Sequence, residues 1–285
     1  MKIVPGIYSV AVSSALCKAT SADIVQVTRS RFPDGEMYVR IDDSLEGEEI
    51  LLVSSTRRDE EIIDLLLLLD ACRGRKCGNI TLLIPYFGYA RQHMRYRDGE
   101  AVSSYAIGQA AFSLADRAFV VEVHDLEAIG VFNGKVRNLK VETSIAKSIV
   151  NTPDFVVSPD DGGRERAGVL ARALGCSSFA MEKKRIDSRT VEMEVPEQNI
   201  SGKSVVIIDD IISTGGTVAK ACSVLKEKGA SKIDVVAIHG LFVNNSYGKI
   251  MEFADSITVT NTIDTPYSKI DISAEIYDQI IGGGK

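Results

Sequence analysis

The sequence predicts an α/β protein made of two successive halves, each a mostly parallel sheet flanked by helices. Strand-like and helix-like segments alternate along the chain, which is typical of this class. At 285 residues the chain exceeds a typical single domain, and the alternation repeats in its second half. We therefore expect domains over residues 1–140 and 141–285, with the last helix packing back on the first domain.

Apolar, β-branched runs predict the strands of the first half. They are expected at Lys2–Ile7, Asp23–Arg29, Glu49–Ser54, Asn79–Ile84 and Ala118–Glu122. Helices are expected at Ser13–Thr20, Glu60–Arg73, Ser103–Ala115 and Leu126–Phe132. The longest apolar run, Leu65 to Leu69, is far too short to span a membrane and is expected in a buried helix.

The second half repeats this plan. Strands are expected at Phe155–Ser158, Ser177–Met181, Ser204–Ile208, Asp234–Gly240 and Ser256–Thr260. Helices are expected at Glu142–Asn151, Gly163–Leu174, Val218–Lys228, Tyr247–Ala254 and Ile272–Ile280. Because functional loops of such folds follow the carboxyl ends of the strands, polar residues at those ends are candidate site residues.

Composition narrows the function classes. Hydrophobic residues make up 45% and charged residues 25%, and the net charge is −6, so a broad nucleic-acid-binding face is not expected. Met1 leads directly into a strand-like segment without a signal peptide. The five cysteines form no CxxC pair, which predicts neither a zinc site nor a disulfide framework, but reduced thiols in a cytoplasmic protein.

The segment SVVIIDDIISTGGT, residues 204–217, is the most informative one. Its apolar run leads into two acids, Asp209 and Asp210, followed by the hydroxyls and glycines of residues 213–217. Backbone N–H groups around two glycines, next to a helix N-terminus, favour phosphate binding, and the acids suit sugar hydroxyls or hydrated Mg²⁺. No lysine follows the glycines, so this is not a Walker A loop. The alternative is a tight turn with Thr217 as the helix cap.

Two segments of the first half have the chemistry of a nucleotide site. Phe32 offers a flat face to a base, and Asp34 and Glu36 can accept hydrogen bonds from its amino group; a plain type I turn is the alternative. The loop at residues 85–97 contains three arginines and suits a polyphosphate, although a solvated surface loop has the same composition.

Three further segments end strands with charged or metal-binding residues. His124 ends an apolar strand and is either a metal ligand or a core histidine. Residues 158–163 bring two acids and two glycines to a helix start, where a helix cap explains only Asp161. Lys183 and Arg185 precede a long polar run, either as solvated surface or as part of a flap over a charged transition state.

The loop at residues 209–217 resembles the phosphoribosyl-diphosphate (PRPP) loop of phosphoribosyltransferases and ribose-phosphate diphosphokinases. All these segments together occur in the order and spacing of the ribose-phosphate diphosphokinase (PRPP synthetase) family, over nearly the whole chain. The compact length and the STGGT loop are most similar to its archaeal branch. The resemblance implies two phosphoribosyltransferase-like domains.

The resemblance also implies roles for individual residues. Those implied for ATP are Phe32, Asp34, Gly35, Glu36, Arg91 and Gln92, with Ser54, Ser55 and Thr56 in a smaller loop near the phosphates. Those implied for ribose 5-phosphate are Asp209, Asp210, Ser213, Thr214, Gly215, Gly216 and Thr217. His124 and Asp160 correspond to protein ligands of Mg²⁺, and Lys183 and Arg185 to the catalytic pair of the flap.

The implied reaction moves the diphosphoryl group of ATP to O1 of ribose 5-phosphate, with Mg²⁺ as cofactor. In this family ATP lies between subunits, so a homo-oligomer, at least a dimer, is expected, without nucleic-acid or membrane partners. Ser213 stands where many bacterial relatives have an acid, and His93 where an aspartate is common. The alternatives are a silent regulatory subunit and a phosphoribosyltransferase acting on a base; the retained site residues disfavour the first, and the two-domain length the second.

Overall fold

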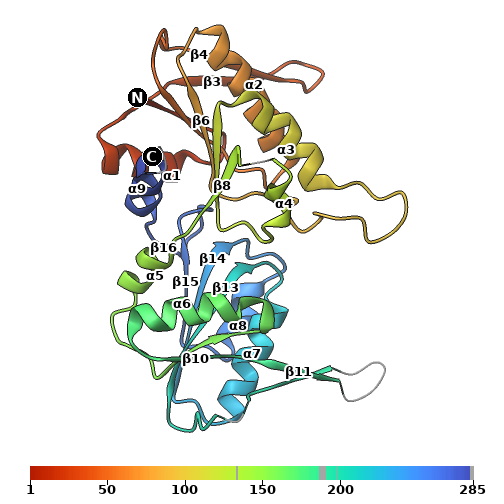
Figure 1. Cartoon of the computed structure of the whole chain (residues 1–285), viewed down its shortest axis with the longest axis vertical. Helices are drawn as coiled ribbons and strands as arrows, with labels where there is room; N and C mark the ends of the chain where they lie inside the picture. The colour runs from red at the N-terminus through yellow and green to blue at the C-terminus, as the bar shows by residue number, and fades with distance from the viewer. Residues whose placement is uncertain (133, 186–190, 197, 283–285) are drawn as a thin grey trace. The chain divides into compact units, whose positions relative to one another are not determined.

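The computed structural model divides the chain into two compact units, each with its own parallel sheet (Figure 1). It describes residues 1–132, 134–185, 191–196 and 198–282, and only the backbone of residues 183–185, 191 and 192. Unit 1 comprises Met1–Val141, Thr262–Asp264 and Ile272–Lys285. Unit 2 comprises Glu142–Asn261 and Thr265–Asp271. The C-terminal segment therefore belongs to the same unit as the N-terminus.

The sheet of unit 1 has the strand order β2-β1-β5-β6-β7-β8, and all its pairings are parallel. Its strands are β1 (Lys2–Pro5), β2 (Asp23–Ile24), β5 (Ile50–Val53), β6 (Ile80–Ile84), β7 (Arg117–Val121) and β8 (Val136–Leu139). Its helices are α1 (Val10–Thr20), α2 (Asp59–Gly74), α3 (Ser103–Leu114), α4 (Glu127–Gly130) and α9 (Ser273–Gly282). Helices α1 and α9 lie on one side of the sheet, and α2 and α3 on the other (Figure 1).

The sheet of unit 2 has the order β10-β9-β13-β14-β15-β16, again all parallel. Its strands are β9 (Phe155–Ser158), β10 (Ser177–Ala180), β13 (Ser204–Ile212), β14 (Lys232–Gly240), β15 (Ser256–Thr260) and β16 (Ser268–Ile270). Its helices are α5 (Glu142–Ser148), the 3₁₀ turn η1 (Asp161–Gly163), α6 (Arg164–Leu174), α7 (Gly216–Glu227) and α8 (Ser246–Met251). The predicted fold class is confirmed.

Burial on both faces explains why these strands read as continuous apolar runs. Every residue of β5 and β6 is buried, as expected for parallel strands covered by helices on both sides. Leu65 and Leu68 of α2 are fully buried in the same core. The apolar run at Leu65–Leu69 is thus part of a helix that covers a sheet. No helix in the described part of the chain is long and apolar enough to cross a membrane.

Two antiparallel hairpins lie outside the two parallel sheets, and neither was predicted. The expected strand Asp23–Arg29 is divided: β2 stays in the parallel sheet, while β3 (Val27–Arg31) pairs with β4 (Met37–Ile41). In unit 2, β11 (Glu182–Arg185) pairs with β12 (Val191–Glu194). Strands β11 and β12 consist largely of charged residues, and β3 and β4 mix polar and apolar residues without strict alternation, so neither hairpin gives a clear strand signal in the sequence.

Candidate functional site

As the crevice of unit 2 we take the edge beyond the carboxyl ends of β9 and β13, the second and third strands of its sheet. Strand order reverses at this pair, because β10 follows β9 in sequence but lies outside it. Ligands of open α/β sheets bind at such a reversal, beyond the carboxyl ends of the strands. The segments that follow β9 and β13 contain the acids singled out in the sequence, so the fold brings the Asp160 loop and the Asp209–Gly216 segment to one edge.

Strand β13 continues to Ile212, so the prediction that Asp209 and Asp210 end their strand was wrong. Ile211 and Ile212 remain paired with His239 and Gly240 of β14. On the other side, β9 pairs only as far as Ile207. The acid pair therefore stands where one neighbouring strand continues and the other has ended.

The two carboxylates of this crevice influence each other's charge. Burial, followed by the nearby Asp210 carboxylate, raises the pKa of Asp209 well above its usual value, and Arg166 works in the opposite direction. One Asp209 carboxylate oxygen accepts a hydrogen bond from the Asp210 N–H at 2.9 Å. Two carboxylates that crowd each other favour a bound cation or hydroxyl donors at this place.

The N-terminus of α7 has the geometry of an anion site. Gly215 precedes the helix with φ of 74°, and no side chain caps the first turn, so Thr217 is not the cap. The first N–H groups of a helix lack partners within the helix and attract anions. A Cβ atom on Gly215 would lie 2.7 Å from the Cβ of Ser246. Glycine is therefore required here by both conformation and space.

The Asp160 loop is held in shape by Ser158. The Ser158 hydroxyl donates to the Asp160 carbonyl at 2.6 Å, and a Cβ atom on Gly163 would lie 2.3 Å from that hydroxyl oxygen. Arg166, in the first turns of α6, is the site residue whose role the sequence did not reveal. Its Nε is buried without a hydrogen-bond partner among the described residues, and its charge acts on Asp209. An arginine just after two glycines was the only sequence signal.

The predicted flap forms the β11–β12 hairpin, in which Lys183 lies opposite Met193 and Arg185 opposite Val191. The side chains of Lys183 and Arg185, like residues 186–190 of the predicted flap, lie outside what the structure describes. Their catalytic role stays a prediction.

In unit 1, the predicted base-binding segment forms the tip of the β3–β4 hairpin. The Phe32 side chain is 51% exposed, and its ring meets that of Tyr38 edge-on. Gly35 adopts φ of 95°, and the Arg31 guanidinium donates to its carbonyl. Asp34 and Glu36 are exposed at the same tip. The hairpin thus presents an aromatic face and two acids to solvent.

Arg91 and Gln92 lie in the loop after β6. Arg91 is exposed, whereas Gln92 donates to Glu100 at 3.3 Å. No hydrogen bond or ion pair within the described part of the chain joins Arg91 or Gln92 to the tip of the β3–β4 hairpin. A shared ATP site for these two segments therefore stays a prediction.

His124 is exposed in the segment after β7, the strand next to β6. That segment meets the β6 loop through His93, whose Nε2 lies 3.6 Å from Asp125 and 3.7 Å from Glu127. The sequence had given His93 no role. Since His124 belongs to unit 1 and Asp160 to unit 2, a magnesium ion shared by these two residues remains a prediction.

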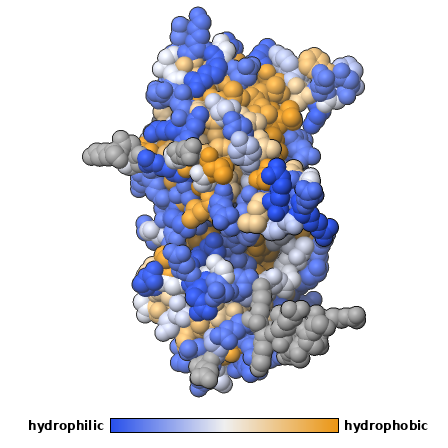
Figure 2. All heavy atoms as spheres, turned by 45° about the vertical axis from the view of Figure 1, so that its right-hand side comes forward, coloured by the Kyte–Doolittle hydropathy of each residue, from blue (hydrophilic) through white to orange (hydrophobic). Residues whose placement is uncertain are grey.

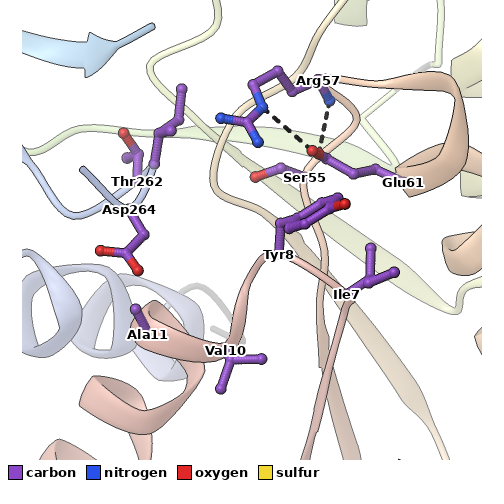
Figure 3. Close-up of a pocket in the computed structure, with 10 residues that line it drawn as sticks. Ile7, Tyr8, Val10, Ala11, Ser55, Arg57, Glu61, Thr262 and Asp264 are labelled. Carbon is purple, nitrogen blue, oxygen red and sulfur yellow. Dashed lines mark hydrogen bonds and ion pairs between the residues drawn. The ribbon is translucent and has the colours of Figure 1, made fainter. Parts of the chain in front are cut away.

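A pocket of about 250 Å³ opens at the β1–β5 reversal of unit 1 (Figure 3). Its lining includes Tyr8, Ser55, Arg57, Glu61 and Asp264. Arg57 donates to the Glu61 carboxylate through its backbone N–H and its Nε, while burial raises the pKa of Glu61.

The hydroxyls of the predicted smaller loop near this pocket serve the fold. Ser55 Oγ accepts from the Tyr86 N–H at 3.1 Å, and Thr56 Oγ1 accepts from the Gly88 N–H at 2.9 Å. These bonds fix the start of the β6 loop, and Ser54 and Thr56 are almost completely buried. Only Ser55 of the three lines the pocket.

Comparisons with known proteins agree with this architecture. A family model described as the N-terminal domain of ribose phosphate pyrophosphokinase matches residues 1–110, and a phosphoribosyl transferase domain model matches residues 136–271. The chain is 44% identical over 283 residues to a ribose-phosphate pyrophosphokinase of Thermoplasma acidophilum, covering 99% of each chain. It is 39% identical to that of Thermococcus kodakarensis over 259 residues, covering 90% and 92%.

A crystal structure of phosphoribosylpyrophosphate synthetase from Mycobacterium smegmatis superposes with a TM-score of 0.84 at 24% identity, covering 99% of both chains. This likeness concerns the fold alone. The domain model that matches residues 136–271 covers most of unit 2, which is therefore a domain of the phosphoribosyl transferase type. The full-length identity goes further: the chain belongs to the ribose-phosphate pyrophosphokinase family. Pyrophosphokinase and diphosphokinase name the same activity, so the predicted family and enzyme class are confirmed.

Proposed function

We propose that this enzyme transfers the diphosphoryl group of ATP to O1 of ribose 5-phosphate, giving PRPP and AMP for nucleotide biosynthesis. The observation that carries the proposal is the match of both halves of the chain to this family at 44% identity. The crevice at β9 and β13 supports it, because an uncapped helix start and a carboxylate pair there suit the two ends of a sugar phosphate.

We assign the binding of ribose 5-phosphate to unit 2. The 5-phosphate would accept hydrogen bonds from the N–H groups at the start of α7 and from the hydroxyls of Ser213, Thr214 and Thr217, with Gly215 and Gly216 allowing close approach. Asp209 and Asp210 would accept hydrogen bonds from the ribose diol. The raised pKa of Asp209 favours this role, since a hydroxyl donor compensates a buried carboxylate for lost hydration.

We assign the binding of ATP to unit 1. The exposed Phe32 ring would stack on adenine, and Asp34 and Glu36 would accept from its amino group. Gly35, at φ of 95°, shapes the turn that presents them. Arg91 and Gln92 would contact the phosphates.

The cofactor we propose is Mg²⁺, held by His124 and Asp160. Asp160 offers the carboxylate oxygen that Mg²⁺ prefers, whereas His124 offers a nitrogen, a donor that transition metals bind more readily. The crowded pair Asp209 and Asp210 is the charge pattern that a nearby cation relieves. Bound Mg²⁺ would neutralise charge on the ATP phosphates.

Catalysis in this scheme rests on positioning. The anomeric hydroxyl attacks the β-phosphorus in line with the departing AMP, so the protein has little covalent chemistry to perform. Lys183 and Arg185 belong to β11, which pairs with β12, and from this strand their positive charges would stabilise the transferring group.

Exposed apolar side chains of unit 1 support the proposal of a homo-oligomer. Large apolar residues with exposures between 41% and 62% occur on and beside α2, α3 and α4: Ile63, Tyr105, Leu114, Leu126 and Val131. Figure 2 shows apolar side chains gathered on one face of this unit. Such a surface is typical of a protein interface, and we propose at least a dimer.

We further propose that the enzyme is cytoplasmic, because its thiols are suited to a reducing compartment. All five cysteines are free, and burial raises the pKa of Cys72 and Cys222 to about 12. Thiols with so high a pKa are poor nucleophiles at neutral pH.

AMP release from ATP and Mg²⁺, with and without ribose 5-phosphate, tests the reaction. We expect release that depends on ribose 5-phosphate and yields PRPP in equal amount. Lys183→Ala should lower kcat by roughly 10² to 10⁵, by analogy with other phosphoryl-transfer enzymes, while the KM for ATP changes within a few-fold. Unchanged turnover would remove Lys183 from the mechanism, and consumption of PRPP only when a base is added would refute the proposed reaction.

A further inference from the structure

His93, Asp125 and Glu127 form a cluster that the proposed reaction does not use. His93 lies in the β6 loop, Asp125 follows β7, and Glu127 begins α4. One ligand atom from each residue lies within 4.8 Å of the other two. All three residues belong to unit 1, so the cluster is complete within one compact unit.

The imidazole of His93 is buried without the hydrogen bonds that burial normally demands. Its side chain is only 10% exposed. Its Nδ1 has no partner among the described residues. Its Nε2 faces the carboxylates of Asp125 and Glu127 at 3.6 and 3.7 Å, which is too long for a hydrogen bond. Nε2, and not Nδ1, is therefore the imidazole nitrogen placed to bind a cation between the two carboxylates.

The spacing of the ligand atoms is suited to a small cation between them. Zinc binds histidine nitrogen and carboxylate oxygen at about 2.0–2.2 Å, so tetrahedral ligands lie about 3.4 Å apart. The two His93 distances are close to this value. The octahedral geometry of Mg²⁺ places neighbouring ligands about 3.0 Å apart. All three ligand atoms lie within 4.8 Å of one another, a limit wider than either geometry. The imidazole nitrogen, rather than the spacing, therefore favours a transition metal over magnesium.

The surroundings support the carboxylates in this role. The Oδ1 atom of Asp125 accepts a hydrogen bond from the Glu127 N–H at 2.8 Å, which leaves Oδ2 facing His93. Outer contacts of this type commonly orient metal ligands. The Glu127 side chain is 71% exposed and has room to move inward. Two carboxylate charges would balance one divalent cation.

We propose that His93, Asp125 and Glu127 bind one divalent transition-metal cation of the zinc type, with the fourth position open. This site is separate from the proposed Mg²⁺ ligands His124 and Asp160. Because His93 follows Gln92 and Asp125 follows His124, the cation would lie beside the segments assigned to ATP. Binding itself requires no substrate, so it can be tested independently of the proposed reaction.

Titration of the full-length protein with Co²⁺ and with Zn²⁺ tests the site. With millimolar Mg²⁺ present throughout to occupy the proposed His124–Asp160 site, we expect one Co²⁺ per chain, with visible d–d absorption and no thiolate charge-transfer band, and displacement of this Co²⁺ by Zn²⁺. His93→Asn and Glu127→Gln should each weaken binding at least about 10-fold. Glu127 is exposed, so Glu127→Gln tests the site even if His93→Asn fails to fold.

Two controls define the site. Glu46→Gln, which removes another exposed carboxylate, and His124→Asn should leave Co²⁺ affinity unchanged. No binding by the wild-type protein, binding with a thiolate band, or binding that survives both His93→Asn and Glu127→Gln would overturn the proposal. Loss of binding in His124→Asn alone would also overturn it. If the metal binds as expected while AMP release is absent, only the proposed reaction fails.

Discussion

At the residue scale, Gly215 is the position where backbone conformation and space most limit the sequence. We predict that Gly215→Ala destabilises the protein, because a left-handed conformation costs a non-glycine residue about 1–2 kcal/mol and the new Cβ would lie 2.7 Å from that of Ser246. Gly216→Ala is the matched control, since no atom lies within 4 Å of its added Cβ and alanine favours helices. Calorimetry should show a lower Tm for the first variant only. Equal Tm values would contradict the account.

The stability of the protein should depend on pH through the ionisation of Asp209. The direction of this dependence is opposite to that of an ordinary ion-paired acid. Its pKa is raised in the folded state, so the folded protein holds a proton that the unfolded chain releases. Stability therefore falls as pH rises from the usual aspartate value through the raised one. We predict that Asp209→Asn raises Tm relative to wild type at pH 7.5 more than at pH 4.

Asp154 is the control, because its pKa is shifted in the opposite direction. Its pKa is lowered to about 2, chiefly by the Ser204 N–H and hydroxyl. Its contribution is therefore present above the usual aspartate pKa and is lost as pH falls toward 2. Asp154→Asn should lower Tm at pH 7.5 and less so at low pH. The same Tm difference at both pH values for either variant would refute the corresponding pKa direction.

At the scale of elements, the proposed ATP-binding residues at the tip of the β3–β4 hairpin and the proposed ribose 5-phosphate loop belong to different units. We predict that Phe32→Ala raises the KM for ATP several-fold without changing the KM for ribose 5-phosphate, because Phe32 belongs to unit 1 and the phosphate loop to unit 2. The ring is half-exposed, so its loss should not unfold the hairpin. Val150→Ala, at 92% exposure, is the control. A parallel rise in both KM values would contradict this assignment.

Periodicity predicted most elements of the two sheets but not the contacts between loops. Strands β9 and β15 begin and end where the sequence indicated, because buried parallel strands give a clear apolar signal. β4 and β12 were missed because each lies in a short two-stranded hairpin outside the alternation of strands and helices. The acid-glycine loop could be recognised because its residues are consecutive. The meeting of His93 with Asp125 could not, since it depends on β6 and β7 being neighbours.

At the scale of the whole molecule, the two ends of the chain meet in unit 1. Helix α9 packs on α1, and Gln279 accepts from the Lys140 N–H and donates to the Lys140 carbonyl. Ile276 and Ile280 of α9 are buried. Helix α9 is therefore part of the packing of unit 1, whose contacts include pairs that are very distant in sequence.

Replacement of one buried side chain in α9 should reveal this dependence. We predict that Ile276→Ala, at 0% exposure, lowers the stability of unit 1 by about 2–5 kcal/mol, as expected for removing a large core side chain. Ile281→Ala, on the same helix at 55% exposure, should change it by less than about 0.5 kcal/mol. Hydrogen exchange read by mass spectrometry separates the units: protection should fall in β1, β5 and β6 but not in β13 or β14. Equal loss in both sheets would mean that the units unfold as one, and no loss in either would show that α9 does not stabilise unit 1.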